Sequence, residues 1–262
     1  VKIILHLTIA DMRSLAVIYR TMISVAECMK TGSPLPSKET VDIPTCLKHA
    51  LLPRWNTAEE FWEKQMRRVM KPLTLGKTLN TPDPKHFRTV EIQITDDIYQ
   101  RIDHYLHKHN MTLFHMSSSL YQLLLHLETS QTCFATTTTV DISRHVPAIS
   151  QEIIRCVSAA VPLVTEIHPN TSIGQFLKNS SHSLKTALDN SFYPEELILD
   201  QIKSEDIRHN ITRHCIVMNN LEPLNDMLGG ENGVSLKDVT IIKNTETKLI
   251  AKYDVKRNQL MY

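Results

Sequence analysis

The sequence lacks the features by which several large classes of protein are recognised. No apolar run reaches the roughly 18 residues that a membrane span needs, and no two of the five cysteines form a CxxC pair. The net charge is +1, so the overall charge gives no reason to expect a nucleic acid or a lipid bilayer as partner. We therefore expect neither a membrane protein, nor a nucleic-acid-binding protein, nor a zinc site built on cysteine.

The cysteines are single and scattered along the chain. An odd number without clustering is typical of reduced thiols in the cytosol, and it does not suit the disulfide framework of a secreted protein. The sequence therefore predicts a cytoplasmic protein. The five positions are Cys28, Cys46, Cys133, Cys156 and Cys215.

What is present is an ordinary globular composition with an unusual beginning. The chain has 262 residues, 42% of them hydrophobic and 22% charged, which is enough for one large domain or two small ones. The first eight residues, Val1–Thr8, are rich in β-branched types and predict a strand. A chain that begins inside a strand indicates a fragment, or a lobe whose upstream half is missing.

Two helices are predicted in the first third of the chain. Asp11 is placed to cap a helix from Met12 to Lys30, and a second helix is expected from Thr57, with Pro72 as its end. Apolar residues recur at helical spacing in both segments and predict their buried faces. These residues are Leu15, Ile18, Met22, Val25 and Ala26 in the first helix and Phe61, Trp62, Met66 and Val69 in the second.

The rest of the chain alternates helices and strands without a regular βαβ rhythm. This pattern predicts the α/β (α+β) class, a mixed β-sheet with covering helices. Ile98, Ile102, Tyr105 and Leu106, and then Leu120, Leu123, Leu124 and Leu127, are the expected core residues of two successive helices. The expected helices cover residues 95–109, 111–127, 171–188 and 194–203; the expected strands cover 87–94, 132–140, 157–166, 211–218, 239–242, 248–254 and 260–262.

Several segments, in the same order, resemble the condensation domains of nonribosomal peptide synthetases. Each segment is short, but together they span almost the whole chain. They are Phe61-Trp62-Glu63, Asn110-Met111-Thr112-Leu113-Phe114, the leucine-rich run that ends at His126, Tyr193-Pro194-Glu195-Glu196-Leu197, Glu205-Asp206-Ile207-Arg208, and Ala251-Lys252-Tyr253-Asp254-Val255. The resemblance implies a fold like that of chloramphenicol acetyltransferase. It also implies that residues 1–262 form the C-terminal lobe, with the N-terminal lobe absent.

The catalytic motif of the family, HHxxxDG, is matched here only in part. The corresponding residues run from His6 to Met12, so the motif lies at the start of the chain. In the family, the second histidine acts as a general base or orients the acceptor amine, and both roles need an imidazole nitrogen. Leu7 occupies that position and has no donor or acceptor. The resemblance therefore predicts little or no catalysis by this chain alone.

The other motif positions favour structural roles. His6 would point away from Leu7 if the two lie in a strand, so we expect a packed or hydrogen-bonded histidine. Asp11 is expected to cap the following helix and to pair with an arginine, Arg144 being one candidate. Met12 replaces the motif glycine, and its side chain would narrow the passage where substrates travel in the family.

Three further groups of polar residues have simpler explanations. Lys64, Arg67 and Arg68 form a basic helical stretch, which is most often a solvated surface but also suits an acidic carrier protein. His104 and His107 share a helix face without the further ligands of a metal site. Ser117, Ser118 and Ser119 lie in a helix without the glycines of a nucleophile elbow. We expect no bound metal.

Three functions remain open at this point. The first is a non-catalytic module that holds neighbouring carrier and adenylation domains or docks a tailoring protein. The second is half of a condensation enzyme, completed by a missing N-terminal lobe, that joins carrier-bound acyl groups in amide or ester bonds. The third is a stand-alone acyltransferase of the same fold. No cofactor is expected to bind directly; the phosphopantetheine of a partner carrier domain would enter an active domain.

Overall fold

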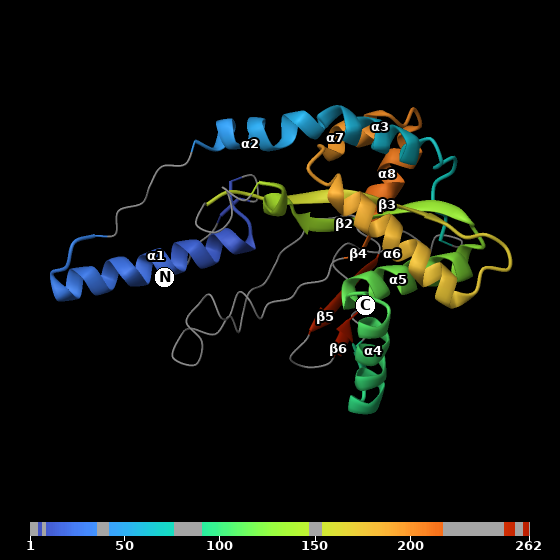
Figure 1. Cartoon of the computed structure of the whole chain (residues 1–262), viewed down its shortest axis with the longest axis horizontal. Coiled ribbons are helices and arrows are strands. Elements are labelled where there is room, and N and C mark those ends of the chain that lie inside the picture. Colours follow the sequence, from blue (N-terminus) through green and yellow to red (C-terminus); the bar gives the residue numbers. More distant parts are fainter. Residues whose placement is uncertain are drawn as a thin grey trace, which may run out of the picture. The chain divides into compact units, whose positions relative to one another are not determined.

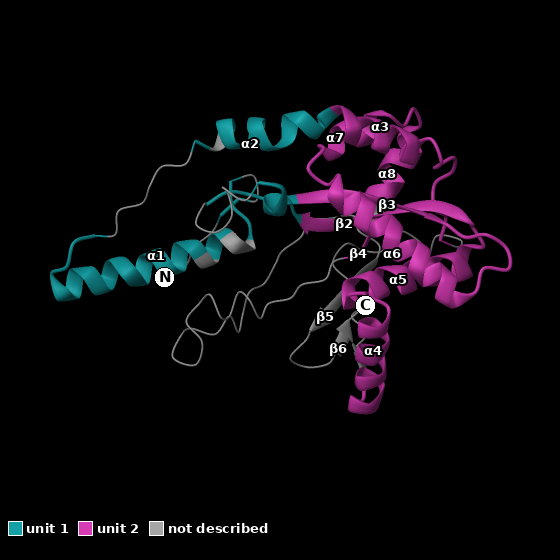
Figure 2. Ribbon diagram, viewed as in Figure 1, with its two compact units in different colours: residues 1–55, 141–158, 220–242 teal, residues 56–140, 159–219, 243–262 magenta. Residues whose placement is uncertain are grey.

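The computed structural model describes residues 5–6, 9–35, 42–75, 91–146, 154–216, 249–254 and 259–261. The chain divides into two compact units, coloured teal and magenta in Figure 2. Unit 1 comprises residues 1–55, 141–158 and 220–242, and unit 2 comprises residues 56–140, 159–219 and 243–262. Each unit is assembled from segments that are far apart in the sequence. No single linker segment therefore separates the two units.

Unit 1 contains two α-helices among its described residues. Helix α1 (Met12–Thr31) begins at the cap residue Asp11 and ends at Gly32, whose φ of 70° is left-handed. Glycine takes this conformation without steric cost, and the Gly32 N–H reaches the carbonyl of Cys28. The helix predicted from Met12 to Lys30 is therefore confirmed to within one residue.

The predicted buried face of α1 is wrong in part. Met22 is 43% exposed and Ala26 is also exposed, whereas Val17, which the periodicity did not select, is only 2% exposed. Leu15, Ile18 and Val25 are half-buried. The buried stripe of α1 is thus shorter than its apolar stripe, and part of the apolar surface of this helix faces outward.

Helix α2 (Ile43–Leu51) was not predicted from the sequence. Its cap is Asp42, whose carboxylate accepts the N–H of Thr45, and a proline follows near the first helical position, where no N–H is needed. Cys46, Leu47, Ala50 and Leu51 pack against the buried Val146 and Val157 and form the core of this unit. The short 3₁₀ helices η1 (Leu52–Arg54) and η2 (Ile142–His145) complete its regular elements among the described residues.

The strand predicted at the beginning of the chain is not found in the residues that can be described. Leu5 and His6 belong to no strand, and the His6 carbonyl accepts the N–H groups of Ile9 and Ala10, 3.0 and 3.2 Å away. The backbone after His6 therefore turns. Residues 1–4 and 7–8 lie outside the described residues.

Unit 2 is built on a mixed sheet in the order β1-β6-β5-β4-β2-β3 (Figure 1). Strands β2–β4 and β4–β5 pair in parallel, and β5–β6 and β1–β6 pair antiparallel. The strands are β1 (Glu91–Gln93), β2 (Cys133–Asp141), β3 (Ser158–Glu166), β4 (His214–Ile216), β5 (Leu249–Asp254) and β6 (Gln259–Met261). The prediction of a mixed sheet with covering helices is confirmed.

The helices of unit 2 bury large aromatic and aliphatic side chains. Trp62 is fully buried, and its indole N–H donates to the carbonyl of Asn190, 3.0 Å away. Asn210 receives the N–H of Leu73 and donates to its carbonyl, so one amide side chain ties an irregular segment to a helix. The helices are α3 (Trp55–Met66), α4 (Asp96–Lys108), α5 (Leu113–Thr129), α6 (Ile173–Asp189), α7 (Glu195–Asp200) and α8 (Glu205–Arg213).

Helix α5 is inverted relative to the prediction. Leu120, Leu124 and Leu127 were expected to be almost fully buried, but they are 43%, 41% and 69% exposed. The buried residues on the helix are instead Ser118, Ser119, Tyr121, Gln122 and Leu125. Gln122 accepts a hydrogen bond of 2.7 Å from Ser180 of α6. This polar contact with α6 and the buried Tyr121 and Leu125 mark the inner face of α5.

Other boundaries differ from the prediction in smaller ways. Ile98 was expected in the core but is 46% exposed, while Leu106 of the same helix is buried. Ile211 was assigned to a strand, yet it lies in α8, and β4 begins only at His214. The predicted strand at residues 239–242 lies outside the described residues.

Candidate functional site

The aspartate of the partial motif holds two stretches of unit 1 together. Asp11 is 9% exposed. One carboxylate oxygen, Oδ1, accepts the backbone N–H of Ser14 at 3.1 Å. The other, Oδ2, accepts the N–H of Val157 at 2.9 Å and lies 3.5 Å from the hydroxyl of Ser158. The predicted helix cap at Asp11 is therefore present, and the same carboxylate binds a segment almost 150 residues away in the sequence.

Ser14 completes this arrangement. Its side chain is fully buried, and its hydroxyl accepts the N–H groups of Arg155 and Asp11, at 3.1 and 3.2 Å. A hydroxyl has one proton to donate, and the shortest acceptor is the carbonyl of Arg155, 2.8 Å away. We call Asp11, Ser14 and the backbone of residues 155–158 the Asp11 clamp. Since Ile142 donates to the carbonyl of Val157 at 2.9 Å, the clamp also fixes the start of η2.

The remaining motif residues are placed only in part. His6 is exposed, Met12 is the first residue of α1, and Leu7 lies outside the described residues. Arg144 is exposed in η2. The hydrogen bonds described for the Asp11 carboxylate come from Ser14, Val157 and Ser158. The expected ion pair between Arg144 and Asp11 stays a prediction.

Sequence reasoning missed Ser14, although a signal for it exists. A capping box places a second polar side chain three residues after the cap, and Ser14 stands in that position relative to Asp11. The long-range partners, Arg155 and Val157, have no such signal because backbone groups carry no sequence pattern. The clamp could therefore be identified only from the structure.

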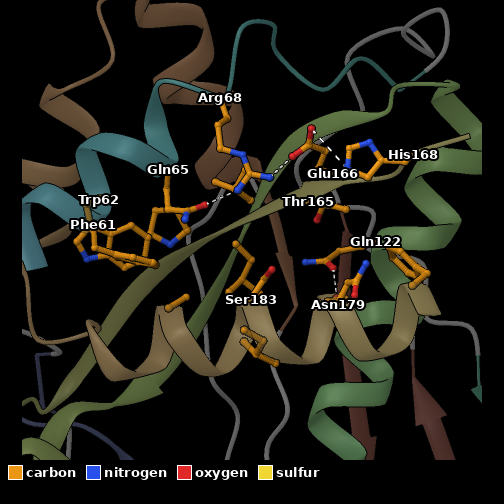
Figure 3. Close-up of a pocket in the computed structure, with 17 residues that line it drawn as sticks. Phe61, Trp62, Gln65, Arg68, Gln122, Thr165, Glu166, His168, Asn179 and Ser183 are labelled. Carbon is orange, nitrogen blue, oxygen red and sulfur yellow. Dashed lines mark hydrogen bonds and ion pairs between the residues drawn. The ribbon is translucent and has the colours of Figure 1, made fainter. Parts of the chain in front are cut away.

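Unit 2 contains an open cleft between α3 and α6, with β3 along its floor (Figure 3). Its volume is about 140 Å³, and it opens to solvent. Phe61 and Trp62 lie at one end and pack edge to face, with ring centroids 4.9 Å apart. Neutral polar side chains line part of the remainder: Gln65, Gln122, Thr165, Asn179, Ser180 and Ser183. Arg68, Glu166, His168 and several apolar side chains also line it. The cleft is thus rich in amides and hydroxyls, which both donate and accept hydrogen bonds.

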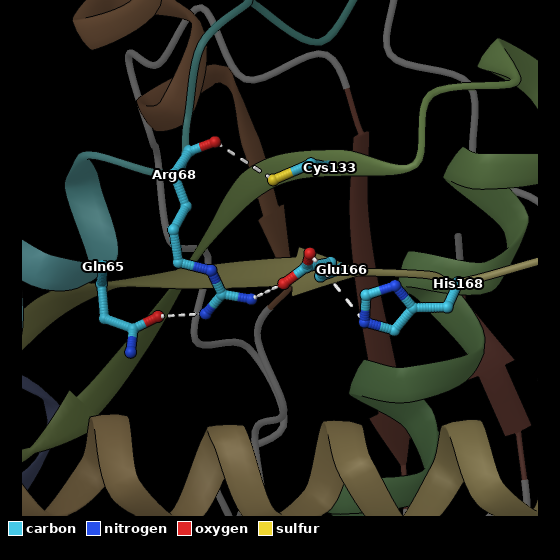
Figure 4. A network of polar contacts seen from close by, with 5 residues as sticks. All are labelled: Gln65, Arg68, Cys133, Glu166 and His168. Atoms are coloured by element: carbon cyan, nitrogen blue, oxygen red, sulfur yellow. Dashed lines mark hydrogen bonds and ion pairs between the residues drawn. The ribbon is translucent and has the colours of Figure 1, made fainter.

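A polar network borders this cleft (Figure 4). Arg68 donates to the side-chain oxygen of Gln65 at 2.8 Å and forms an ion pair with Glu166 at the end of β3. His168 lies 3.9 Å from the other oxygen of Glu166. The Cys133 thiol donates to the carbonyl of Arg68, 3.2 Å away. Burial raises the pKa of this thiol, so it is mostly protonated at neutral pH and poorly nucleophilic.

The basic stretch predicted to bind a carrier protein is only partly exposed on the surface. Lys64 is exposed on α3, and Arg67 is exposed and paired with Glu63 one turn earlier. Arg68 is half-buried, and its charge is matched by Glu166. Of the three predicted residues, Lys64 and Arg67 therefore remain on a surface that a partner protein can reach.

Other candidate groups do not form a centre within the described residues. His104 and His107 are exposed on α4, and His107 lies 3.3 Å from Asp103. In the described part of the chain, no three histidine, cysteine or acidic side chains come together in a way that would hold a metal ion. All five cysteines are described, and none forms a disulfide. No described helix is long and apolar enough to cross a membrane.

A comparison of the sequence with protein-family models gives a match to the Condensation domain over residues 3–258. The chain belongs to the condensation domain family. No curated protein sequence matches this condensation domain. The family membership agrees with the resemblance found in the order of its short motifs, and the motif from His6 to Met12 lies within the matched range.

Solved structures show the same fold at low sequence identity. The complex of the X-domain and OxyB from teicoplanin biosynthesis matches with a TM-score of 0.73 and 13% identity, over 98% of this chain and 60% of that chain. The cyclization-docking bidomain of EpoB from Sorangium cellulosum matches with a TM-score of 0.70 and 15% identity, over 97% of this chain and 52% of that chain. The four-domain nonribosomal peptide synthetase AB3403 matches with a TM-score of 0.67 and 12% identity, over 96% of this chain and 20% of that chain. This condensation domain thus spans clearly less than two thirds of each of these chains.

Proposed function

We propose that this chain is a non-catalytic, condensation-like domain of a nonribosomal peptide or hybrid polyketide assembly line, and that it serves as a docking platform. The observation that carries the proposal is Leu7, which stands where the family has the histidine implied to act as base. An aliphatic side chain can neither accept a proton nor orient an amine. Met12 in place of the motif glycine supports the same conclusion, because its side chain would narrow the substrate passage.

The structural comparisons support a docking role. The X-domain was solved in complex with OxyB, so a domain of this fold can bind a second protein. The synthetase AB3403 carries a matching part within a four-domain chain. We infer that the partners of this chain are carrier and adenylation domains of one assembly line, or a tailoring protein, in the cytoplasm.

An enzymatic alternative has one observation in its favour. The Asp11 clamp is intact, with Asp11 buried and three hydrogen-bond donors around its carboxylate. The clamp fixes the segment that carries the motif, which an active domain would also need. In this alternative, the chain is the C-terminal lobe of a condensation enzyme, and an N-terminal lobe supplies the missing groups. The stand-alone acyltransferase needs the same absent imidazole and has no separate support.

Docking of a carrier protein is tested by charge reversal on the exposed basic surface. A carrier domain with its phosphopantetheine arm is acidic, so Lys64→Glu combined with Arg67→Glu should weaken its binding by about tenfold, measured by surface plasmon resonance. The matched control is Lys108→Glu, an exposed lysine at the end of α4. Equal affinities for the wild type, the double variant and the control would rule out this surface as the carrier site.

A further inference from the structure

The floor of the cleft between α3 and α6 is the free edge of the sheet. Among the described strands, β3 is the last in the sheet order, with β2 as its one neighbour. The five consecutive residues 162–166 of β3 all line the cleft. Successive side chains of a strand point to opposite faces of the sheet. Five consecutive residues can therefore line one cleft only if the cleft runs along the edge of the strand.

Two hydrogen bonds fix which backbone groups point toward this edge. Ile142 donates to the carbonyl of Val157, and Ile167 donates to the carbonyl of Thr132, at 2.9 and 2.8 Å. Both bonds fit one antiparallel register of β2 with β3, in which the odd-numbered residues of β3 face β2. The even-numbered residues then face the cleft. Pro162 agrees with this register, because a proline in a sheet is tolerated where its missing N–H would point away from the neighbouring strand.

The cleft is thus lined by the carbonyl of Pro162 and by the N–H and carbonyl groups of Val164 and Glu166. No hydrogen bond to these groups is made by any part of the chain that the structure describes. Val164 is only 8% exposed, so bulk water reaches it poorly. Buried backbone groups are almost always paired, because an unpaired one costs about as much as a lost hydrogen bond.

One buried side chain in the same cleft also lacks a hydrogen-bond partner among the described residues. Thr165 is 3% exposed, and its hydroxyl has no hydrogen-bond partner among the described residues. Gln65, Asn179 and Ser183 add donors and acceptors at the walls (Figure 3). These groups are neutral, and the charges of Arg68 and Glu166, which also line the cleft, are paired with each other. The cleft therefore suits a neutral, extended ligand that offers donors and acceptors at regular spacing.

We propose that the edge of β3 binds an extended peptide segment of a partner protein, which adds a strand to the sheet between α3 and α6. Alternate residues of the peptide pair with Val164 and Glu166, as in β-strand addition to other exposed sheet edges. The site lies entirely in unit 2 and involves no residue of the motif. It goes beyond the docking role proposed above, and it holds whether or not the domain is catalytic.

The experiment uses the whole chain and a defined probe, the N-acetylated peptide Thr-Val-Thr-Val-Thr with a fluorescent label. Its β-branched residues favour an extended backbone. Two derivatives carry N-methyl groups, one on the valines and one on the threonines. We expect one derivative to lose about tenfold in affinity, since its hydrogen bonds to β3 are blocked, and the other to bind like the parent peptide.

Two proline variants provide the matched comparison. Val164→Pro removes an edge N–H inside the cleft, and Ala160→Pro removes one from the same edge of β3 outside it. The first should abolish binding of the probe, and the second should leave its affinity unchanged. If Val164→Pro fails to fold, the pair of N-methylated probes and the hydrogen exchange of the Val164 amide in the wild type, which the bound probe should slow further, decide the question.

Four results would overturn the proposal. They are equal loss of affinity by both N-methylated peptides, no binding up to about 1 mM, a Val164 amide whose exchange the probe leaves unchanged, and a dimer that Val164→Pro converts to monomer. The fourth would mean that a second copy of the chain fills the edge. A failed carrier-binding or condensation assay leaves this proposal untouched.

Discussion

At the scale of single residues, the partial motif has the aspartate of the family motif, Asp11, but has Leu7 in place of its second histidine. Asp11 and Ser14 are buried and hydrogen-bonded to the backbone of residues 155–158. Leu7, by contrast, removes the nitrogen that both family roles require. Loss of a buried carboxylate with three hydrogen-bond donors would cost stability, whereas loss of an imidazole that serves only in catalysis would cost little stability. This difference explains how one position of a motif persists while another decays.

Replacing Asp11 by alanine tests the clamp. The N–H groups of Ser14 and Val157 lose their acceptor, so we expect the free energy of unfolding to fall by about 2–3 kcal/mol. Urea denaturation followed by circular dichroism measures this change. Asp42→Ala is the matched control, because Asp42 is an exposed cap with one backbone partner. Equal losses in the two variants would show that Asp11 is only a helix cap.

Glu195 predicts a pH dependence of stability in unit 2. Burial, with a smaller effect of neighbouring Glu196, raises the pKa of its carboxyl. The folded state therefore binds more protons than the unfolded state between the two pKa values, and stability falls as the pH rises through that range. Glu195→Gln should raise Tm at pH 7 and have little effect below about pH 4. A rise in Tm that is the same at both pH values would contradict this account.

At the scale of elements, α5 shows why a hydrophobic pattern alone is an incomplete guide. Its leucines predicted a buried stripe, but the helix turns its serines and Gln122 toward the rest of unit 2. The reason lies in its neighbour, because Ser180 of α6 supplies a donor for Gln122. A single-sequence pattern cannot show which neighbour a helix will meet.

Two adjacent leucines of α5 test this orientation. Leu125 is 1% exposed and Leu124 is 41% exposed. Leu125→Ala should therefore cost about 2–5 kcal/mol of stability, and Leu124→Ala less than about 1 kcal/mol. Chemical denaturation of both variants under the same conditions gives the comparison. A larger loss for Leu124→Ala would mean that the leucine stripe is buried after all.

Most of the regular elements were predictable, and the reasons are local. Asp11, Thr112 and Ser172 stand before apolar periodicity, and each caps a helix through its side chain. Strands β2 and β3 are rich in threonine and valine, and their predicted positions are correct to within about one residue. The two-unit division, the Asp11 clamp and the free edge of β3 were not predictable, because each depends on contacts between distant segments.

At the scale of the whole molecule, nearly the entire chain matches the condensation domain family and its fold. The match to the Condensation domain covers residues 3–258, and the related X-domain structure superimposes over 98% of this chain but only 60% of its own. The motif within that matched range carries a leucine at its reactive position. We therefore propose, as the central claim, that this domain serves as a docking platform in an assembly line and catalyses no amide or ester bond.

A condensation assay tests that claim most directly. The wild-type chain and Leu7→His are mixed with carrier proteins loaded with donor and acceptor groups, and the product is measured by mass spectrometry. The account predicts no product above background from the wild type, and any gain of activity only in Leu7→His. Turnover by the wild-type chain would contradict it, because a nitrogen from another residue would then have to serve as the base.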